Sequence, residues 1–356
     1  MTSNINQLCK DPLFQINLAI WMAQPQSLLH FYIYPIFYES GLRIYSIGPL
    51  LALPPDIRLA VAEKINCQEA VRPDLILESQ RNRRLCILEC KASSFGPESS
   101  TASQARSFLL ISSKILSEVL GLPTRAESEG MVCYLIGPDN AELMERTLDA
   151  LEKEIKEKVN CESGNYSCLK IRPFESSIIL EYPEKIKKYM TLKKDSPIQI
   201  IEINKDTDPR PLYFIPYDPN IQQRKEEQEY CRRVLFERIL SYVLSSIGGS
   251  TIPGSITFLT DDLLNAATFG IFDIWEDNEA KKHIKRLVRD FIENIRASIN
   301  EPLRQCISYE SQKGWIIDLK DKGIQDELLK QLQKYKPEEL DLSKKIEPTL
   351  FENTEI

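Results

Sequence analysis

The sequence contains only two histidines, His30 and His283, and neither lies near a cysteine pair at the spacing of a zinc site. The same scarcity argues against a Ser-His-Asp triad, for which one of these two residues would have to serve. The nine cysteines form no CxxC pair, and we expect them to be reduced. No GxxxxGK[ST] or GxGxxG motif is present, so the sequence offers no glycine-rich loop for a nucleotide phosphate.

Long apolar runs and a basic, apolar leader are also missing. No apolar stretch reaches the roughly 20 residues that a membrane-spanning helix needs, and the first residues lack the pattern of a signal peptide. We therefore expect a cytoplasmic protein without a membrane partner. With 356 residues, of which 42% are hydrophobic and 27% charged, the chain is long enough for two globular domains.

The net charge of −7 is unfavourable for a protein that binds nucleic acid, because contacts to the phosphate backbone use Lys and Arg. Total charge discriminates poorly where basic and acidic residues are segregated. A nuclease also needs acidic residues as metal ligands, and a partner protein can supply part of the DNA affinity. The acidity lowers the expectation of nucleic-acid binding without excluding it.

Two apolar stretches, residues 72–78 and 85–91, carry charged side chains near one end. The short polar segment between them has the length of a hairpin turn, which predicts two antiparallel strands. If the turn is centred in that segment, Asp74 lies directly across from Glu89, about 5 Å away at Cβ. Lys91 points to the same side of the sheet as Glu89. The hairpin therefore gathers two carboxylates and an amine in an apolar setting, where ionised groups are costly unless paired or metal-bound.

Pro73-Asp74, followed after a gap by Glu89-Cys90-Lys91, resembles the PD-(D/E)xK nuclease superfamily over roughly residues 30–140. The resemblance implies a restriction-endonuclease-like α/β fold, with a mixed sheet flanked by helices. It implies that Asp74 and Glu89 hold Mg²⁺, which Mn²⁺ would replace, helped by the backbone carbonyl of Cys90. Lys91 would orient the attacking water or stabilise charge on the phosphate.

A purely structural interpretation is the alternative. Asp74 would then begin a surface strand, and Glu89 and Lys91 would be a solubilising pair on an edge strand. Against this, residues 85–88 make the second strand apolar on both faces, which is typical of a central strand. A structural role does not explain why Glu89 and Lys91 lie at the end of a central strand.

The segment after the hairpin predicts a helix over residues 103–120. In RecB-like branches of the superfamily this helix carries Gln followed four residues later by Tyr. Gln104 matches the first position, but Phe108 lacks the hydroxyl of the second. Gln104 is predicted to support the site as a catalytic residue, and the alternative is an ordinary helix residue. Arg106 is predicted to contact a phosphate, and the alternative is a solvated side chain. Glu63, on an earlier helix, is the candidate for a third carboxylate, although a plain surface position is the stronger alternative for it.

The patterns along the chain predict a nuclease-like domain at 1–218, a winged-helix-like domain at 219–335 and a mobile polar tail at 336–356. In the first domain, residues 11–24 and 139–158 predict helices, and residues 31–38, 42–48 and 131–136 predict strands.

The second domain has the order helix, helix, helix, β-hairpin, which is that of a winged helix. Its third helix, residues 279–299, has an apolar stripe, and basic residues crowd its first half outside that stripe. The predicted nucleic-acid contacts are Lys281, Lys282, Lys285, Arg286 and Arg289 in this helix, and Lys313 in the hairpin. A protein-binding winged helix, or a plain helical cap, is the alternative.

Together these features predict a Mg²⁺-dependent endonuclease that hydrolyses phosphodiester bonds of DNA in a mobile-element, restriction or phage-defence setting. Because double-strand cleavage requires two sites, we expect a homodimer or a multi-protein complex. Two alternatives remain. The chain would be a non-catalytic DNA-binding or assembly subunit on a nuclease-like scaffold, or a winged-helix transcription regulator.

Overall fold

The chain divides into two compact units. The first unit comprises Met1–Arg224 and Thr268–Ile284, and the second comprises Lys225–Ala267 and Lys285–Ile356. Residues 268–284 thus belong with the first unit, whereas the sequence placed all of 219–335 in one domain. The computed structural model describes residues 2–25, 33–79, 84–111, 116–121, 130–137, 139–161, 163–203, 209–310 and 314–335. The predicted tail, 336–356, lies outside these residues.

The first unit is built on a seven-stranded mixed sheet in the order β1-β4-β5-β6-β7-β8-β9. Strands β5, β6 and β7 are parallel to one another, and the remaining neighbours are antiparallel. The strands are β1 (Leu42–Ile47), β4 (Leu75–Ser79), β5 (Leu85–Lys91), β6 (Gly130–Ile136), β7 (Asn165–Phe174), β8 (Ser177–Glu181) and β9 (Ile198–Glu202). A separate two-stranded sheet pairs β2 (Leu51–Ala52) with β3 (Ala70–Val71).

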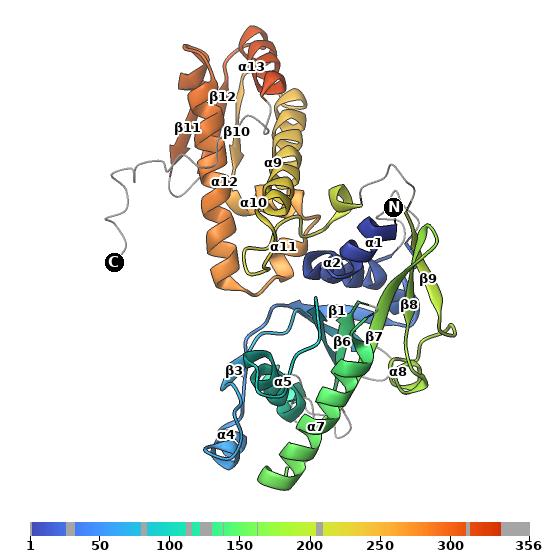
Figure 1. Ribbon diagram of the computed structural model, residues 1–356. Coiled ribbons are helices and arrows are strands. Elements are labelled where there is room, and N and C mark those ends of the chain that lie inside the picture. Colours follow the sequence, from blue (N-terminus) through green and yellow to red (C-terminus); the bar gives the residue numbers. More distant parts are fainter. Residues whose placement is uncertain are drawn as a thin grey trace. The chain divides into compact units, whose positions relative to one another are not determined.

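Helices cover both faces of the large sheet (Figure 1). On one face lie α5 (Ser100–Ile111) and α7 (Ala141–Val159), and on the other lie α1 (Thr2–Cys9) and α2 (Pro12–Ala23). The first unit is therefore a mixed α/β structure. Its shorter helices are α3 (Ile36–Glu39), α4 (Pro55–Val61), α6 (Leu116–Val119), α8 (Glu184–Met190) and α11 (Ile271–Ile274), with a 3₁₀ turn, η2, at Arg210–Leu212.

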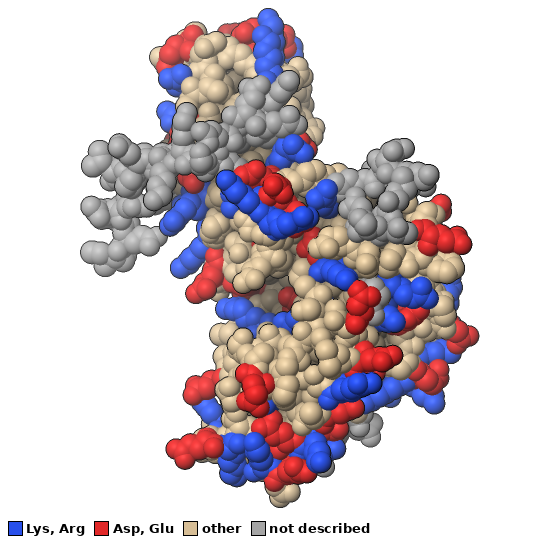
Figure 2. Space-filling view, in the orientation of Figure 1, with Lys and Arg blue, Asp and Glu red and all other residues tan. Residues whose placement is uncertain are grey.

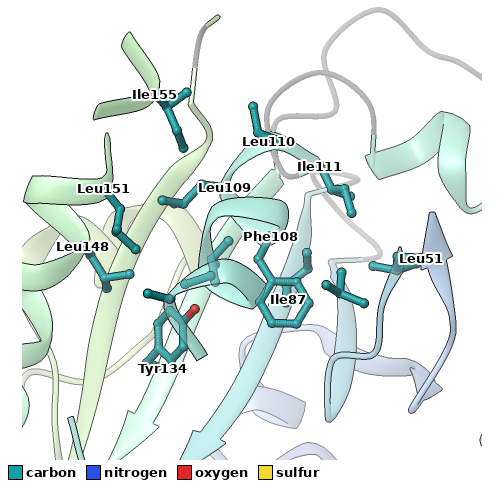
Figure 3. Packing of buried hydrophobic residues seen from close by; sticks show 14 of the residues in the cluster. Leu51, Ile87, Phe108, Leu109, Leu110, Ile111, Tyr134, Leu148, Leu151 and Ile155 are labelled. Carbon is teal, nitrogen blue, oxygen red and sulfur yellow. The ribbon is translucent and has the colours of Figure 1, made fainter. Parts of the chain in front are cut away.

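The main core of this unit lies between the sheet and helices α5 and α7. Figure 3 shows Phe108 of α5 pointing toward Ile87 of β5, with Leu148 and Leu151 of α7 facing the same cluster. Because side chains alternate along a strand, Glu89 lies on the same face of β5 as Ile87, toward α5. The core packing therefore sets the direction in which the charged end of β5 faces.

Helix α2 is apolar almost all round, and every residue from Leu13 to Ala23 is buried. Its start is set by Asp11, whose side chain accepts a hydrogen bond from the Leu13 N–H at 2.9 Å, and by a proline at the first helical position. Two amide side chains, Gln15 and Asn17, lie fully buried in this helix. Buried polar groups of this kind need specific partners.

The predicted strand at 31–38 is wrong over its second half. Ile36–Glu39 form helix α3, and Ile33 makes only an isolated bridge to Ile201. Residues 31 and 32 lie outside the described part of the chain. Pro35, directly before α3, suits the start of a helix and ends extended pairing. The aromatic and β-branched residues around it gave a strand pattern that the tertiary structure overrides.

The second unit contains a three-stranded antiparallel sheet in the order β10-β12-β11, packed with helices. The rings of Phe236 and Phe291 stack in its core, with centroids 4.2 Å apart. Helix α12 begins in the first unit and continues into the second. The elements are α9 (Lys225–Gly248), β10 (Gly254–Phe258), α10 (Thr260–Ala267), α12 (Asn278–Ser298), η3 (Leu303–Cys306), β11 (Ile307–Glu310), β12 (Gly314–Leu319) and α13 (Lys322–Lys334).

Gly314 fixes the start of the central strand β12. Its φ is +81°, in the left-handed region, and a Cβ at this position would lie 2.4 Å from the Phe258 carbonyl oxygen. Only glycine fits such a close backbone approach.

Candidate carboxylate site

The predicted hairpin forms with the predicted register. Strands β4 and β5 are antiparallel, and Leu75 pairs with Leu88, Ile76 with Ile87 and Leu77 with Cys86. Continuing this register by one residue brings Asp74 opposite Glu89, at the end of the pair. The central position of β5, between β4 and β6, agrees with its apolar character on both faces.

Asp74, Glu89 and Lys91 are here called the carboxylate site. The two carboxylates are joined through backbone hydrogen bonds. The Asp74 N–H donates to Glu89 Oε2 at 3.2 Å, and the Cys90 N–H donates to Asp74 Oδ2 at 2.6 Å. Glu89 is buried, with 3% of its surface exposed. Each carboxylate is thus held by the backbone of the opposite strand.

Lys91 completes the site from the same face of β5. Its Nζ lies 2.8 Å from Glu89 Oε1 and donates to Gln104 Oε1 of α5 at 3.2 Å. The Gln104 amide in turn donates to the Arg72 carbonyl at 3.5 Å. The structure therefore brings together Asp74, Glu89, Lys91 and Gln104, and Gln104 fixes the position of the ammonium group. Phe108 lies in the core against Ile87, where a hydroxyl is not needed.

The electrostatics of the site are dominated by burial. Burial raises the pKa of Asp74 well above its usual value, and the Glu89 charge raises this pKa further. The Lys91 ammonium and the Cys90 N–H oppose that rise without cancelling it. Burial lowers the pKa of Lys91, but Glu89 and Asp74 together more than offset this, so the net pKa of Lys91 is raised. Glu89, which is buried, and Asp74, which is partly buried, share a single ammonium and leave uncompensated negative charge if both are ionised.

Asp218, which the sequence did not single out, lies close enough to Asp74 for its charge to raise the Asp74 pKa. Glu63, the predicted third carboxylate, is exposed on a left-handed turn just after α4, with φ +62°. The charges that act on the Asp74 pKa are Glu89, Lys91 and Asp218, not Glu63.

Gln15 of α2 is a second site neighbour that sequence reasoning missed. Its Nε2 donates to the backbone carbonyls of Cys9, at 2.9 Å, and Lys91, at 3.1 Å. Within the described ranges, its Oε1 is buried and accepts no hydrogen bond. A buried carbonyl oxygen without a donor is unfavourable unless water or a ligand supplies one. The signal in the sequence was an amide inside an otherwise apolar helix.

Arg106 does not face a phosphate-binding surface, which corrects its predicted role. It is 3% exposed, and its guanidinium contacts Glu154 of α7 at 2.7 Å and donates to the carbonyls of Asn66 and Pro97. These contacts tie α5 to α7 and to the loops beside them. The sequence gave no indication that this position of α5 points into the core.

The predicted basic helix is present as α12, but its cations are not equivalent. Lys282, Arg286 and Arg289 are exposed. Lys285 pairs with Asp261 at 2.8 Å, and the Lys281 ammonium lies over the Phe272 ring, 4.7 Å from its centroid. Basic side chains lie along the outer side of α12 in Figure 2, among acidic ones. Lys313 lies outside the described residues.

The donor set of the carboxylate site is oxygen-rich: two carboxylates and the Cys90 carbonyl, which is the chemistry that Mg²⁺ and Mn²⁺ prefer. Among the residues that the structure describes, no three or more His, Cys, Asp or Glu side chains lie together as a ready-made metal-binding group. The residues fit a hydrated cation held by two carboxylates better than a cation fully enclosed by protein ligands.

Comparison with family models, curated proteins and solved structures found no match to this chain. Within the described residues, no helix is both long enough and apolar enough to span a bilayer. The function is therefore inferred from the geometry of the site itself.

Proposed function

We propose that this chain is a divalent-metal-dependent phosphodiesterase that cleaves DNA, of the PD-(D/E)xK class. One observation carries the proposal: Asp74 and Glu89 meet across the end of a central hairpin, with Lys91 2.8 Å from Glu89 on the same face. A buried, negatively charged pair beside an ammonium group has no structural benefit that an apolar pair would not provide. Perturbed carboxylates of this kind are typical of functional sites.

Asp74 and Glu89 would hold Mg²⁺ or Mn²⁺ together with the Cys90 carbonyl. When bound, the cation would supply Lewis-acid stabilisation of charge on the phosphate. Lys91 places its ammonium where a substrate phosphate or an attacking water would approach the carboxylates. Gln104 holds that ammonium in place through its 3.2 Å hydrogen bond. Burial and the Glu89 charge favour the protonated form of Asp74, and a bound cation would favour its ionised form.

The arrangement of elements supports the finer fold assignment that this proposal requires. In the first unit, the antiparallel strands β1, β4 and β5 are followed by α5 and by β6, which is parallel to β5. This order agrees with the α/β core that a restriction-endonuclease-like fold would have. In the second unit, helices α9, α10 and α12 precede the β11–β12 hairpin, which agrees with a winged helix. On that assignment, the exposed Lys282, Arg286 and Arg289 of α12 are its DNA-contacting cations.

The proposal implies a second copy or a partner. A single carboxylate site hydrolyses one phosphodiester bond, so double-strand cleavage requires a homodimer or a multi-protein complex. A mobile-element, restriction or phage-defence system would use such an assembly.

Cleavage of supercoiled plasmid with Mg²⁺ tests the proposal. We expect the wild-type chain to nick or linearise the plasmid, and Lys91→Ala and Asp74→Ala each to lower the rate by about a thousandfold. Lys153→Ala is the matched control, because Lys153 is exposed on α7 and pairs with Glu157 at the surface. Cleavage that survives both site variants would remove the carboxylate site from the mechanism.

A second candidate is a DNA-binding or assembly subunit without catalysis. The feature that favours it is the acidic balance of the chain, with a net charge of −7, which leaves less positive charge for the phosphate backbone. Absence of cleavage on duplex, single-stranded DNA and RNA, together with retained DNA binding, would favour this candidate.

A further inference from the structure

Asp218 belongs to a segment that is anchored beside the carboxylate site by α2. Asn17 of α2 binds Ile215 twice: its Nδ2 donates to the Ile215 carbonyl and its Oδ1 accepts from the Ile215 N–H, both at 2.9 Å. Two residues earlier in the same helix, Gln15 donates to the Lys91 carbonyl at the end of β5. Helix α2 therefore connects the start of this segment to the strand that carries Glu89 and Lys91.

A second, independent set of contacts approaches Asp218 from the β4 side. The Gly48 N–H donates to the Asp74 carbonyl at 3.1 Å. Gly48 packs against Asp277, since a Cβ on Gly48 would lie 3.5 Å from the Asp277 Cβ. Asp277 Oδ2 accepts from the Asn220 side chain at 2.7 Å, and the Asn220 N–H donates to Asp218 Oδ1 at 2.9 Å. The Asp218 segment is thus connected, through these intervening contacts, to the ends of both strands of the β4–β5 hairpin.

The Asp218 carboxylate is buried without a cationic partner. It is 8% exposed, and among the described residues no Lys or Arg lies within ion-pair distance of it. Burial raises its pKa to about 6, with a further rise from Asp277 that the Asn220 N–H opposes. An unpaired buried carboxylate costs stability, so this position needs a compensating role. The orphaned Oε1 of Gln15 shows that hydrogen-bond donors are also lacking on the α2 side of the site.

We propose that Asp218 is the third acidic group of the carboxylate site and that it binds the hydration shell of the divalent cation held by Asp74 and Glu89. Mg²⁺ and its analogues retain several waters in protein sites, and those waters need acceptors. A buried carboxylate without a cationic partner, held by hydrogen bonds on a segment beside the ends of β4 and β5, meets that need. Such outer-sphere acceptors contribute substantially to metal affinity. The inference rests on the proposed function, since it presupposes a cation at Asp74 and Glu89.

A local structural role would explain Asp218 differently. Its Oδ1 accepts the Asn220 N–H, which is the hydrogen bond of an Asx turn. Asp218→Asn separates the two roles, because asparagine keeps the accepting oxygen but loses the charge. Asp218→Ser provides a second variant that retains a turn-forming side chain.

Calorimetric titration of the metal-free, full-length protein with Mn²⁺ tests the inference without an activity readout. We expect Asp218→Asn and Asp218→Ser to weaken Mn²⁺ binding by about tenfold or more. Asp195→Asn is the control, since it removes an exposed carboxylate that pairs with Lys187 and takes no part in these contacts. We expect that variant to leave the Mn²⁺ affinity unchanged.

The outcomes distinguish this inference from the function it rests on. Loss of Mn²⁺ binding in Asp74→Asn, with wild-type affinity in both Asp218 variants, overturns the role of Asp218 and leaves the proposed function standing. An equal loss in the Asp218 and Asp195 variants also overturns it, because the loss would then follow from the reduced net negative charge of the protein and not from the position of Asp218. No Mn²⁺ binding by the wild type overturns the proposed function itself.

Discussion

The carboxylate site of the first unit and the basic face of α12 in the second handle charge in opposite ways. At the site, Glu89 is 3% exposed and Lys91 is only partly exposed, and each charged group contacts another charged or polar group. On α12, Arg286 and Arg289 project into solvent. The first arrangement raises pKa values and costs folding free energy, whereas the second costs little.

The difference teaches where function can be inferred from geometry. Exposed cations on a helix are compatible with many roles, because solvation removes most of their energetic consequence. At Asp74, burial and the neighbouring Glu89 charge raise the pKa of the carboxyl group. Such a group lowers the stability of the fold at neutral pH, so its retention indicates a functional requirement. The carboxylate site therefore constrains the function more strongly than α12 does.

The largest effect on stability is expected where a buried cation holds the first unit together. Arg106→Met removes three acceptor contacts and leaves Glu154 with Lys158 as its remaining partner, so we expect the free energy of unfolding to fall by about 3 kcal/mol. Lys153→Met, on the exposed side of α7, is expected to change it by less than about 0.5 kcal/mol. Urea denaturation measures both. Similar values for the two variants would break the distinction between buried and exposed charge.

The next effect concerns Asp74 and pH. Its pKa is higher in the folded than in the unfolded state, so its contribution favours folding below the unfolded pKa of about 3.9 and is lost as pH rises through the folded pKa. Asp74→Asn removes this titration while keeping an acceptor for the Cys90 N–H. Without metal, we expect the variant to be more stable than wild type by about 1–3 kcal/mol at pH 7.5.

Thermal unfolding in the presence of a chelator, from pH 4 to pH 8, measures this difference. It should shrink toward pH 4, where the wild-type carboxyl is protonated in the folded state and about half protonated in the unfolded state. A variant that is less stable than wild type at pH 7.5 would contradict the account of a strained, uncompensated carboxylate.

The smallest effect is expected on the α12 face. Replacing Arg286 and Arg289 together by Ala should lower DNA affinity by about tenfold and reduce the salt dependence of binding by about two phosphate contacts. Stability should change by less than about 0.5 kcal/mol, because both side chains are exposed. Fluorescence anisotropy at several salt concentrations measures the binding. An unchanged salt dependence would remove α12 from the DNA interface.

The hairpin and its charged end could be predicted from the sequence because the relevant residues are close along the chain. Two apolar strands and a short turn leave few registers, and the one with Asp74 opposite Glu89 is also the one that pairs Leu75 with Leu88. Gln104 could be placed because the helix follows the hairpin directly. Local patterns were sufficient for this part of the site.

The rest could not be predicted because it depends on contacts between distant segments. Asp218 accepts a hydrogen bond from Asn220 in a segment that Asn17 holds at Ile215, and nothing in its local sequence marks it as buried. Arg106 looks solvated in a helical pattern until α7 supplies Glu154. Strand β10 is short and mostly exposed, and it is defined by its pairing with β12.

The most direct test is a crystal of the wild-type protein soaked in Mn²⁺, with data collected for anomalous scattering. The account predicts an anomalous peak in contact with carboxylate oxygens of both Asp74 and Glu89, beside the Lys91 ammonium. A well-ordered site with no peak there, at Mn²⁺ concentrations that saturate binding in solution, would contradict it.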